Sequence, residues 1–141
     1  MSYTIDQLWL DDGTQIYPLR DTKLVIESLE VEKQAYHKEE IDNGNSGAAK
    51  TIDWRNGNVQ KITMTDNCTF TFINPSGAGW YSLRSTQDAG GTNTYIWTGG
   101  GLAVKWDGDT EPTWTVVGDE ENMHTFYFDG ANWKGSGWTE S

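Results

Sequence analysis

The sequence has little of several residue types, and each shortage excludes a class of protein. It contains one cysteine, Cys68, so no disulfide can form within the chain and packing alone must hold the fold, as suits a reducing cytoplasm. Basic residues are scarce, with 10 Lys and Arg against 21 Asp and Glu. The net charge of -11 has the wrong sign for the phosphates of nucleic acids or anionic lipids, so we expect neither as a partner.

Long apolar segments are absent as well. No 18 consecutive residues are apolar, and the first residues lack a basic segment followed by an apolar run. We therefore expect neither membrane insertion nor export. With 141 residues the chain is too short for two domains of ordinary size, so one hydrophobic core is expected.

Groups suited to catalysis or metal binding are few. His37 and His124 are the only histidines, and there is no Gly-x-Ser-x-Gly element and no phosphate-binding glycine loop before a helix. One cysteine and two distant histidines do not make a transition-metal site. Asp107, Asp109 and Glu111 have a spacing that can wrap calcium, but a solvated glycine turn explains the same residues. We predict no catalytic residue, no metal site and no cofactor.

The C-terminal two thirds of the sequence contains a series of short runs in which apolar and polar residues alternate. In the clearest run, Phe70 and Phe72 fall on one face of a strand and threonines on the other. Ile62 and Met64 share one face of the preceding run, and residues 66–67 predict a hairpin turn between the two runs.

Glycine, asparagine and aspartate clusters separate these runs, and residues 129–130 predict a further tight turn. Roughly eight to ten strands fit. Two sheets that bury their inner faces against each other would be an economical solution, so we predict an all-β fold, an antiparallel β-sandwich or jelly-roll-like barrel, over residues 44–141. The candidate strands are 34–41, 48–54, 58–65, 69–73, 80–87, 93–98, 102–106, 114–117, 122–128 and 132–138.

Residues 1–43 have a different pattern and are predicted to form an anchoring hairpin and a neck. Runs 5–10 and 15–19 flank the turn-forming residues 11–14, but an isolated two-stranded hairpin is marginal in water and must dock on its own domain or on a partner. Residues 21–33 allow either a helix or a strand. The apolar residues available for docking are Ile5, Leu8, Trp9, Leu10, Ile16 and Tyr17.

Six stretches follow one another in the β-rich part of the chain: 48–54, 57–65, 68–72, 87–91, 104–106 and 125–133. Together they resemble a β-domain of tailed-phage virion proteins, which occurs in tail fibres, head fibres and related appendages. The opening stretches 5–8, 12–14 and 19–21 also resemble the N-terminal segment of many phage fibre proteins. The resemblance implies a virion appendage, usually a homotrimer, that is anchored to a capsid or tail protein through its N-terminus and displays its C-terminal domain. It implies no catalytic residues.

The tryptophans are the most informative candidates for ligand contact. Flat aromatic faces beside hydrogen-bonding side chains are typical of sugar-binding surfaces, and Trp80, Trp97, Trp133 and Trp138 are the candidates. The competing interpretation is that most tryptophans in a small β-domain belong to the core or to a subunit interface.

These observations predict a non-enzymatic virion structural protein, a short head or tail fibre or a decoration subunit, that touches the host surface or its glycans. A free carbohydrate-binding module is the first alternative. A cell-envelope glycoside hydrolase that uses paired carboxylates is the second.

Overall fold

The computed structural model describes residues 8–9, 15–16, 37–99 and 102–140. The chain divides into two compact units, Met1–Tyr36 and His37–Ser141, which are considered separately. In the first unit, β1 (Leu8–Trp9) and β2 (Gln15–Ile16) pair antiparallel. This confirms the hairpin at these four residues. The rest of the predicted hairpin and the neck at 21–33 lie outside the described residues.

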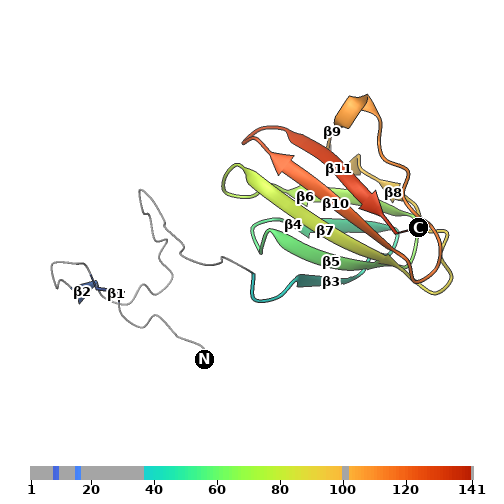
Figure 1. Cartoon of the computed structure of the whole chain (residues 1–141), viewed down its shortest axis with the longest axis horizontal. Coiled ribbons are helices and arrows are strands. Elements are labelled where there is room, and N and C mark those ends of the chain that lie inside the picture. The colour runs from blue at the N-terminus through green and yellow to red at the C-terminus, as the bar shows by residue number, and fades with distance from the viewer. Residues whose placement is uncertain (1–7, 10–14, 17–36, 100–101, 141) are drawn as a thin grey trace. The chain divides into compact units, whose positions relative to one another are not determined.

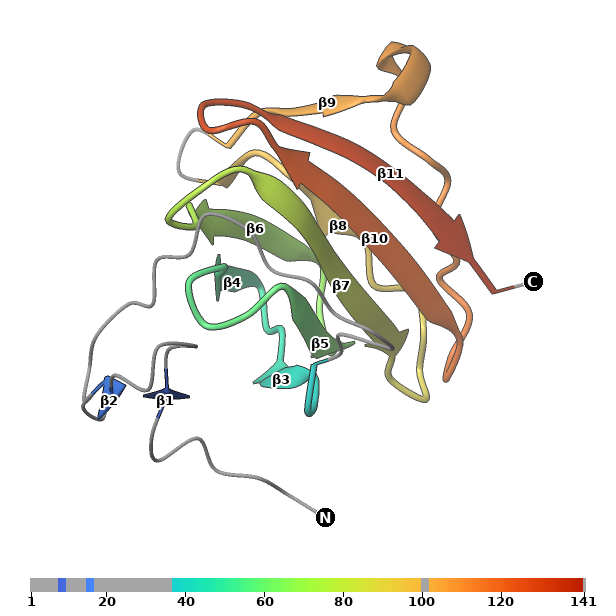
Figure 2. The ribbon, with the colours of Figure 1, turned by 60° about the vertical axis from the view of Figure 1, so that its left-hand side comes forward.

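The second unit, the β-domain, consists of two sheets (Figures 1 and 2). The larger has six strands in the order β3-β5-β7-β10-β11-β9, and the smaller has three in the order β4-β6-β8. The prediction of an all-β domain is confirmed. The strands are β3 (Ile41–Asn45), β4 (Ala49–Asp53), β5 (Val59–Met64), β6 (Cys68–Ile73), β7 (Gly79–Gln87), β8 (Tyr95–Ile96), β9 (Val104–Trp106), β10 (Glu121–Phe128) and β11 (Trp133–Thr139).

The pairing differs from the prediction, because the antiparallel arrangement holds for only part of the β-domain. From β3 to β8 the chain alternates between the two sheets, so each of the strands β3 to β6 pairs in parallel with the strand that comes two later. Among the described strands of this unit, only β7, β10 and β11 form antiparallel neighbours, and β9 adds in parallel to β11. An alternating sequence shows which face of a strand is buried, but it does not show which strand lies beside it.

The predicted hairpin at residues 66–67 is therefore wrong. β5 and β6 belong to different sheets, and the turn carries the chain from one sheet to the other. Asn67 fixes this corner to the next passage of the chain, because its side-chain oxygen accepts hydrogen bonds from the backbone N–H of Thr94 at 2.8 Å and from the Thr94 hydroxyl at 2.9 Å. The turn at 129–130 is confirmed: Asp129 accepts hydrogen bonds from the backbone N–H groups of Ala131 and Asn132 between β10 and β11.

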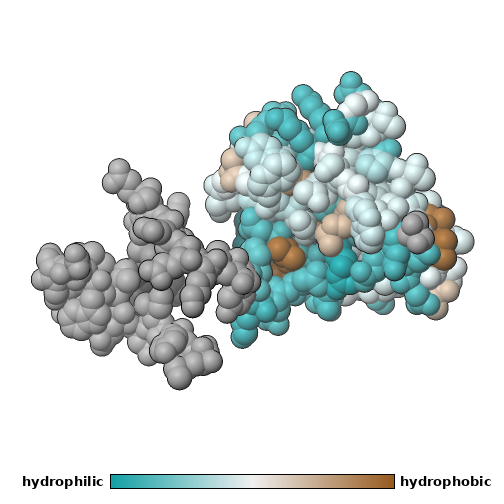
Figure 3. Space-filling model, in the orientation of Figure 1, coloured by the Kyte–Doolittle hydropathy of each residue, from teal (hydrophilic) through white to brown (hydrophobic). Residues whose placement is uncertain are grey.

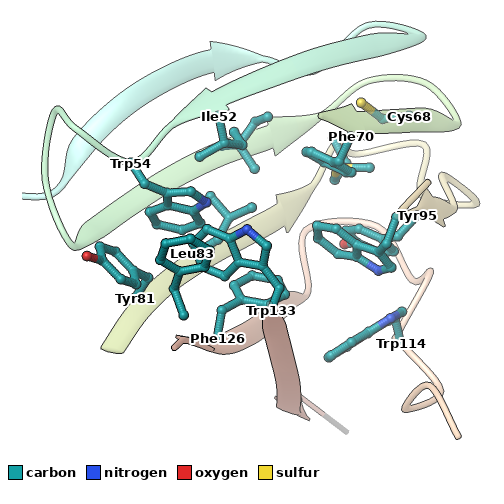
Figure 4. Packing of buried hydrophobic residues seen from close by; sticks show 14 residues of the cluster. Ile52, Trp54, Cys68, Phe70, Tyr81, Leu83, Tyr95, Trp114, Phe126 and Trp133 are labelled. Carbon is teal, nitrogen blue, oxygen red and sulfur yellow. The ribbon is translucent and has the colours of Figure 1, made fainter. Parts of the chain in front are cut away.

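The core lies between the two sheets and is dominated by aromatic side chains (Figure 4). Phe70 is fully buried and stacks on Trp97 with ring centroids 4.6 Å apart, while Phe72 packs against the same cluster. Ile62 and Met64 are buried from the facing sheet. The predicted faces of these two runs are thus confirmed, and close ring pairs of this kind add about 0.5–1.5 kcal/mol each beyond the burial of their area.

Two of the predicted strands differ from the strands of the structure. Residues 114–117 contain no strand, although Trp114 is buried in the core. The predicted opening strand 34–41 coincides with a described strand only at Ile41, where β3 begins. The part of the chain that the structure describes contains no helix long and apolar enough to span a membrane.

Glycines on the inner face of β11 make room for two tryptophan rings. A Cβ atom added at Gly135 would lie 2.5 Å from Cζ3 of Trp106, and one added at Gly137 would lie 2.1 Å from Cη2 of Trp114. Both distances are too short for a real contact. The small residues of β11 are therefore what allows the β9 segment and the following loop to close over the core.

We expect Gly135→Ala to lower the free energy of unfolding by about 1–3 kcal/mol, because the Trp106 ring must move to admit the methyl group. Urea denaturation measures the change. Gly77→Ala is the matched control, since nothing lies within 4 Å of a Cβ atom there. Equal stability of the two variants would contradict the packing described for β11.

Candidate ligand-binding groove

The outward-facing side chains of the six-stranded sheet form rows that run across neighbouring strands. In one row Trp80 of β7 lies opposite Tyr127 of β10, Tyr127 lies opposite Lys134 of β11, and Lys134 lies opposite Lys105 of β9. In the next row Ser82, Thr125 and Ser136 follow in the same order. The area over β7, β10 and β11 is mostly pale in the space-filling view, which marks residues of intermediate hydropathy (Figure 3).

Except for Ser82, the residues of these two rows line a groove of about 460 Å³. One part of the groove is aromatic and another carries lysines, while Thr125 of β10 and Ser136 of β11 contribute hydroxyl groups. The 3-10 turn that follows β9, Asp107–Asp109, borders one end. The lining residues are Trp80, Lys105, Trp106, Asp107, Gly108, Thr125, Tyr127, Lys134, Gly135 and Ser136.

Trp80 and Tyr127 form the aromatic part of the groove. Their ring centroids are 5.0 Å apart with an interplanar angle of 50°, and Trp80 is 66% exposed. The Asn58 side chain donates a hydrogen bond to the Trp80 carbonyl at 2.9 Å, which holds the backbone of the exposed tryptophan in place. Nζ of Lys134 lies 5.6 Å from the centroid of the Tyr127 ring. An aromatic surface next to hydroxyl and ammonium donors can bind the apolar and polar faces of a sugar together.

Trp138, a second candidate, lies on the same face of the sheet but does not line the groove. It is 62% exposed and stands opposite Met123 of β10, which in turn stands opposite Arg84 of β7. Arg84 is already engaged, because its guanidinium forms ion pairs with Glu40 and Glu121. The hydrogen bond from Arg84 lowers the pKa of Glu40 below its ordinary value.

Trp97 and Trp133, the other two candidates, belong to the core, so sequence reasoning was wrong about their availability. Each is only 4% exposed. Trp97 is stacked on Phe70, and the Trp133 ring lies 5.0 Å from that of Phe72. The indole N–H of Trp133 donates to the side-chain oxygen of Asn74 at 3.0 Å. No sugar ring can stack on either side chain while the sheets are packed.

Sequence reasoning missed Tyr127, Lys134 and Lys105 as groove residues. Tyr127 and Lys134 could have been found from the hairpin turn predicted at 129–130. Alternation of side chains on either side of that turn sets Tyr127 opposite Lys134. No comparable signal exists for Trp80 and Lys105. They reach the groove only because β7 and β9 lie beside β10 and β11, which the sequence does not specify.

A buried serine–histidine pair lies inside the core. Ser85 Oγ is 2.9 Å from Nε2 of His124, and both residues are 0% exposed. The Tyr95 hydroxyl is hydrogen-bonded to Ser85 and accepts a bond from the Asn122 side-chain amide. Nδ1 of His124 has no hydrogen-bond partner among the described residues, so no carboxylate orients the ring as in a catalytic triad. Sealed from solvent, the pair joins β7 to β10 within the core.

Of the three carboxylates considered for calcium, Glu111 has another partner. Glu111 accepts a hydrogen bond from the indole of Trp114 at 2.8 Å. No group of three or more His, Cys, Asp or Glu residues that could hold a metal ion lies within the described residues. A general acid needs a raised pKa. In contrast, hydrogen bonds lower the pKa values of the carboxyl groups of Glu40, Asp42, Asp53 and Asp129.

The predicted docking residues of the first unit can be placed only in part. The backbones of Leu8, Trp9 and Ile16 belong to β1 and β2. Ile5, Leu10 and Tyr17 lie outside the described residues. The surface predicted to dock on a partner is therefore not described.

Comparisons of the sequence with models of known protein families and with curated proteins, and of the structure with solved structures, find no match. The resemblance to phage appendages therefore rests on the sequence motifs alone.

Burial of His124 predicts a specific dependence of stability on pH. Desolvation lowers the pKa of its imidazole from 6.5 to about 3 in the folded state. Below pH 6.5 the unfolded chain binds the proton and the folded chain does not, so stability falls by about 1.4 kcal/mol per pH unit toward pH 3. Between about pH 7 and about pH 5 we expect a loss of about 2 kcal/mol.

Urea denaturation at the two pH values measures this loss. His124→Gln, which keeps a polar group beside Ser85, is less stable at neutral pH but loses clearly less stability on acidification. Parallel pH profiles for the two proteins would contradict the burial of a neutral imidazole.

Proposed function

We propose that the protein is a non-enzymatic structural subunit of a tailed-phage virion, a head or tail fibre or a decoration protein, whose β-domain contacts glycans of the host surface. The proposal is carried by one observation: Trp80, 66% exposed, packs beside Tyr127 in a groove that also holds hydroxyl groups and lysines. The ordered sequence motifs support the virion context. The division of the chain into two compact units supports separate anchoring and display.

The exposure of Trp80 favours a ligand at this position. Burial of a large aromatic side chain stabilises by about 1.5–3 kcal/mol relative to full exposure, and this chain buries Trp54, Trp97 and Trp133 almost completely. Because Trp80 is 66% exposed, its side chain contributes only a small part of that stabilisation. A sugar ring laid on the exposed indole would recover it, while Thr125 and Ser136 are placed to bond to sugar hydroxyls.

We class the β-domain as a two-sheet sandwich of mixed pairing and assign the anchoring role to the first unit. Its apolar residues would dock on a capsid or tail protein. A homotrimer would then present three grooves from one attachment point, and linked weak contacts hold more tightly than single ones because the later contacts are intramolecular.

A free carbohydrate-binding module is the second candidate, because the same groove would serve it. The two functions differ in assembly. A monomer that binds glycans without joining any particle would favour the free module, and a trimer would favour the appendage. No observation in the structure favours the cell-envelope hydrolase.

We expect Trp80→Ala to weaken glycan binding by about tenfold or more, since it removes the stacking surface, which corresponds to about 1.4 kcal/mol. A glycan array followed by calorimetry on the full chain measures this. The folded state should be unaffected because the indole is mostly exposed. Ile96→Ala, which alters a 43% exposed residue of β8 in the other sheet, is the control and should bind normally. A Trp80→Ala protein that binds every glycan as well as the wild type would refute the groove.

We also expect a chain that lacks residues 1–20 to fail to join virus particles, because it has lost the apolar residues predicted to dock. Occupancy on particles, measured by mass spectrometry against the full-length chain, tests this. Full occupancy of the shortened chain would show that another part of the protein makes the attachment.

A further inference from the structure

The groove carries two neighbouring positive charges, of which one has no ion-pair partner among the described residues. Lys105 of β9 and Lys134 of β11 are directly opposite each other on the outer face of the sheet. Like charges in directly opposed positions destabilise a sheet. Lys134 is partly compensated, since its Nζ lies 3.6 Å from a carboxylate oxygen of Asp129.

Lys105 differs from the other cations on the strands of the β-domain. Lys61 pairs with Asp42 at 3.3 Å, and Arg84 pairs with two glutamates. Lys50 donates to backbone carbonyls. Within the described residues, Lys105 has neither an ion pair nor a hydrogen bond through its side chain. In a chain of net charge -11, two opposed lysines that line one groove are the exception.

We propose that the groove takes an acidic saccharide, a sugar chain that bears carboxylates, with one carboxylate held between Lys105 and Lys134. This inference rests on the proposed glycan contact and names its ligand class. The carboxylate would give Lys105 the counter-charge that it lacks and would add to the one that Asp129 supplies to Lys134. Charge-assisted hydrogen bonds of this kind contribute more than neutral ones.

The order of side chains across the sheet gives the ligand a direction. Trp80 and Tyr127 occupy the β7 and β10 side, and the lysines occupy the β11 and β9 side. Three strand spacings separate the ends of this row, about 14 Å, which is more than one sugar ring needs. A neighbouring ring would therefore stack on the aromatic pair. Asp107 lines the groove as well, so a carboxylate is favoured near the lysines and a sugar hydroxyl near Asp107.

The test compares two forms of one sugar chain. The probes are an oligogalacturonate, which carries a carboxylate on every ring, and its fully methyl-esterified form, which has no charge. Calorimetry with the full chain at low salt should give a Kd for the acid about tenfold or more below that of the ester. Raising the salt from about 20 to about 200 mM should weaken binding of the acid only.

Lys105→Gln should abolish this preference by weakening the acid about tenfold without changing the ester. Lys38→Gln, at an exposed lysine that does not line the groove, is the matched control and should keep the preference. Trp80→Ala should weaken both probes.

Each remaining outcome counts against the proposal in a distinguishable way. Equal binding of acid and ester, with Trp80→Ala weakening both, would overturn the acidic ligand and leave the glycan contact standing. Binding of neither probe would also overturn the acidic ligand, and the glycan array with the Trp80→Ala protein would then decide the proposed function alone.

Discussion

Alternation of side chains along the strands is the constraint on which both the core and the groove depend. Because successive residues of a strand point to opposite faces, every residue buried between the sheets fixes the outward position of its neighbour. On β7, Tyr81 and Leu83 are buried, and this places Trp80 and Ser82 on the outer face. A shift of one residue would bury Trp80 and expose Tyr81, so the packing of the core maintains the groove.

The faces of the strands could be predicted from the sequence, but their neighbours could not. The pairs Phe70 with Phe72 and Ile62 with Met64 were assigned correctly to buried faces, because alternation is a local property. Parallel pairing between strands two apart depends on a corner that changes sheet. Asn67 makes that corner by bonding to Thr94, a residue distant in sequence, and its neighbours otherwise look like a hairpin turn.

The groove was predictable to a similar extent. Trp80 and Trp138 were identified as candidates and are exposed, but composition could not distinguish them from the buried Trp97 and Trp133. All four tryptophans occur in alternating runs near small residues. Which of them are exposed to solvent depends on how the two sheets pack against each other. Lys105 was missed because nothing in its own run shows that β9 joins β11 and sets it opposite a second lysine.

The partition of tryptophans between core and surface is tested most directly by hydroxyl-radical footprinting of the intact chain, read at each tryptophan by mass spectrometry. The account predicts fast oxidation of Trp80 and Trp138, which are 66% and 62% exposed, and strong protection of Trp97 and Trp133, which are 4% exposed. Oxidation of Trp97 or Trp133 at the rate of Trp80 would contradict the two-sheet packing from which the groove and its proposed ligand are derived.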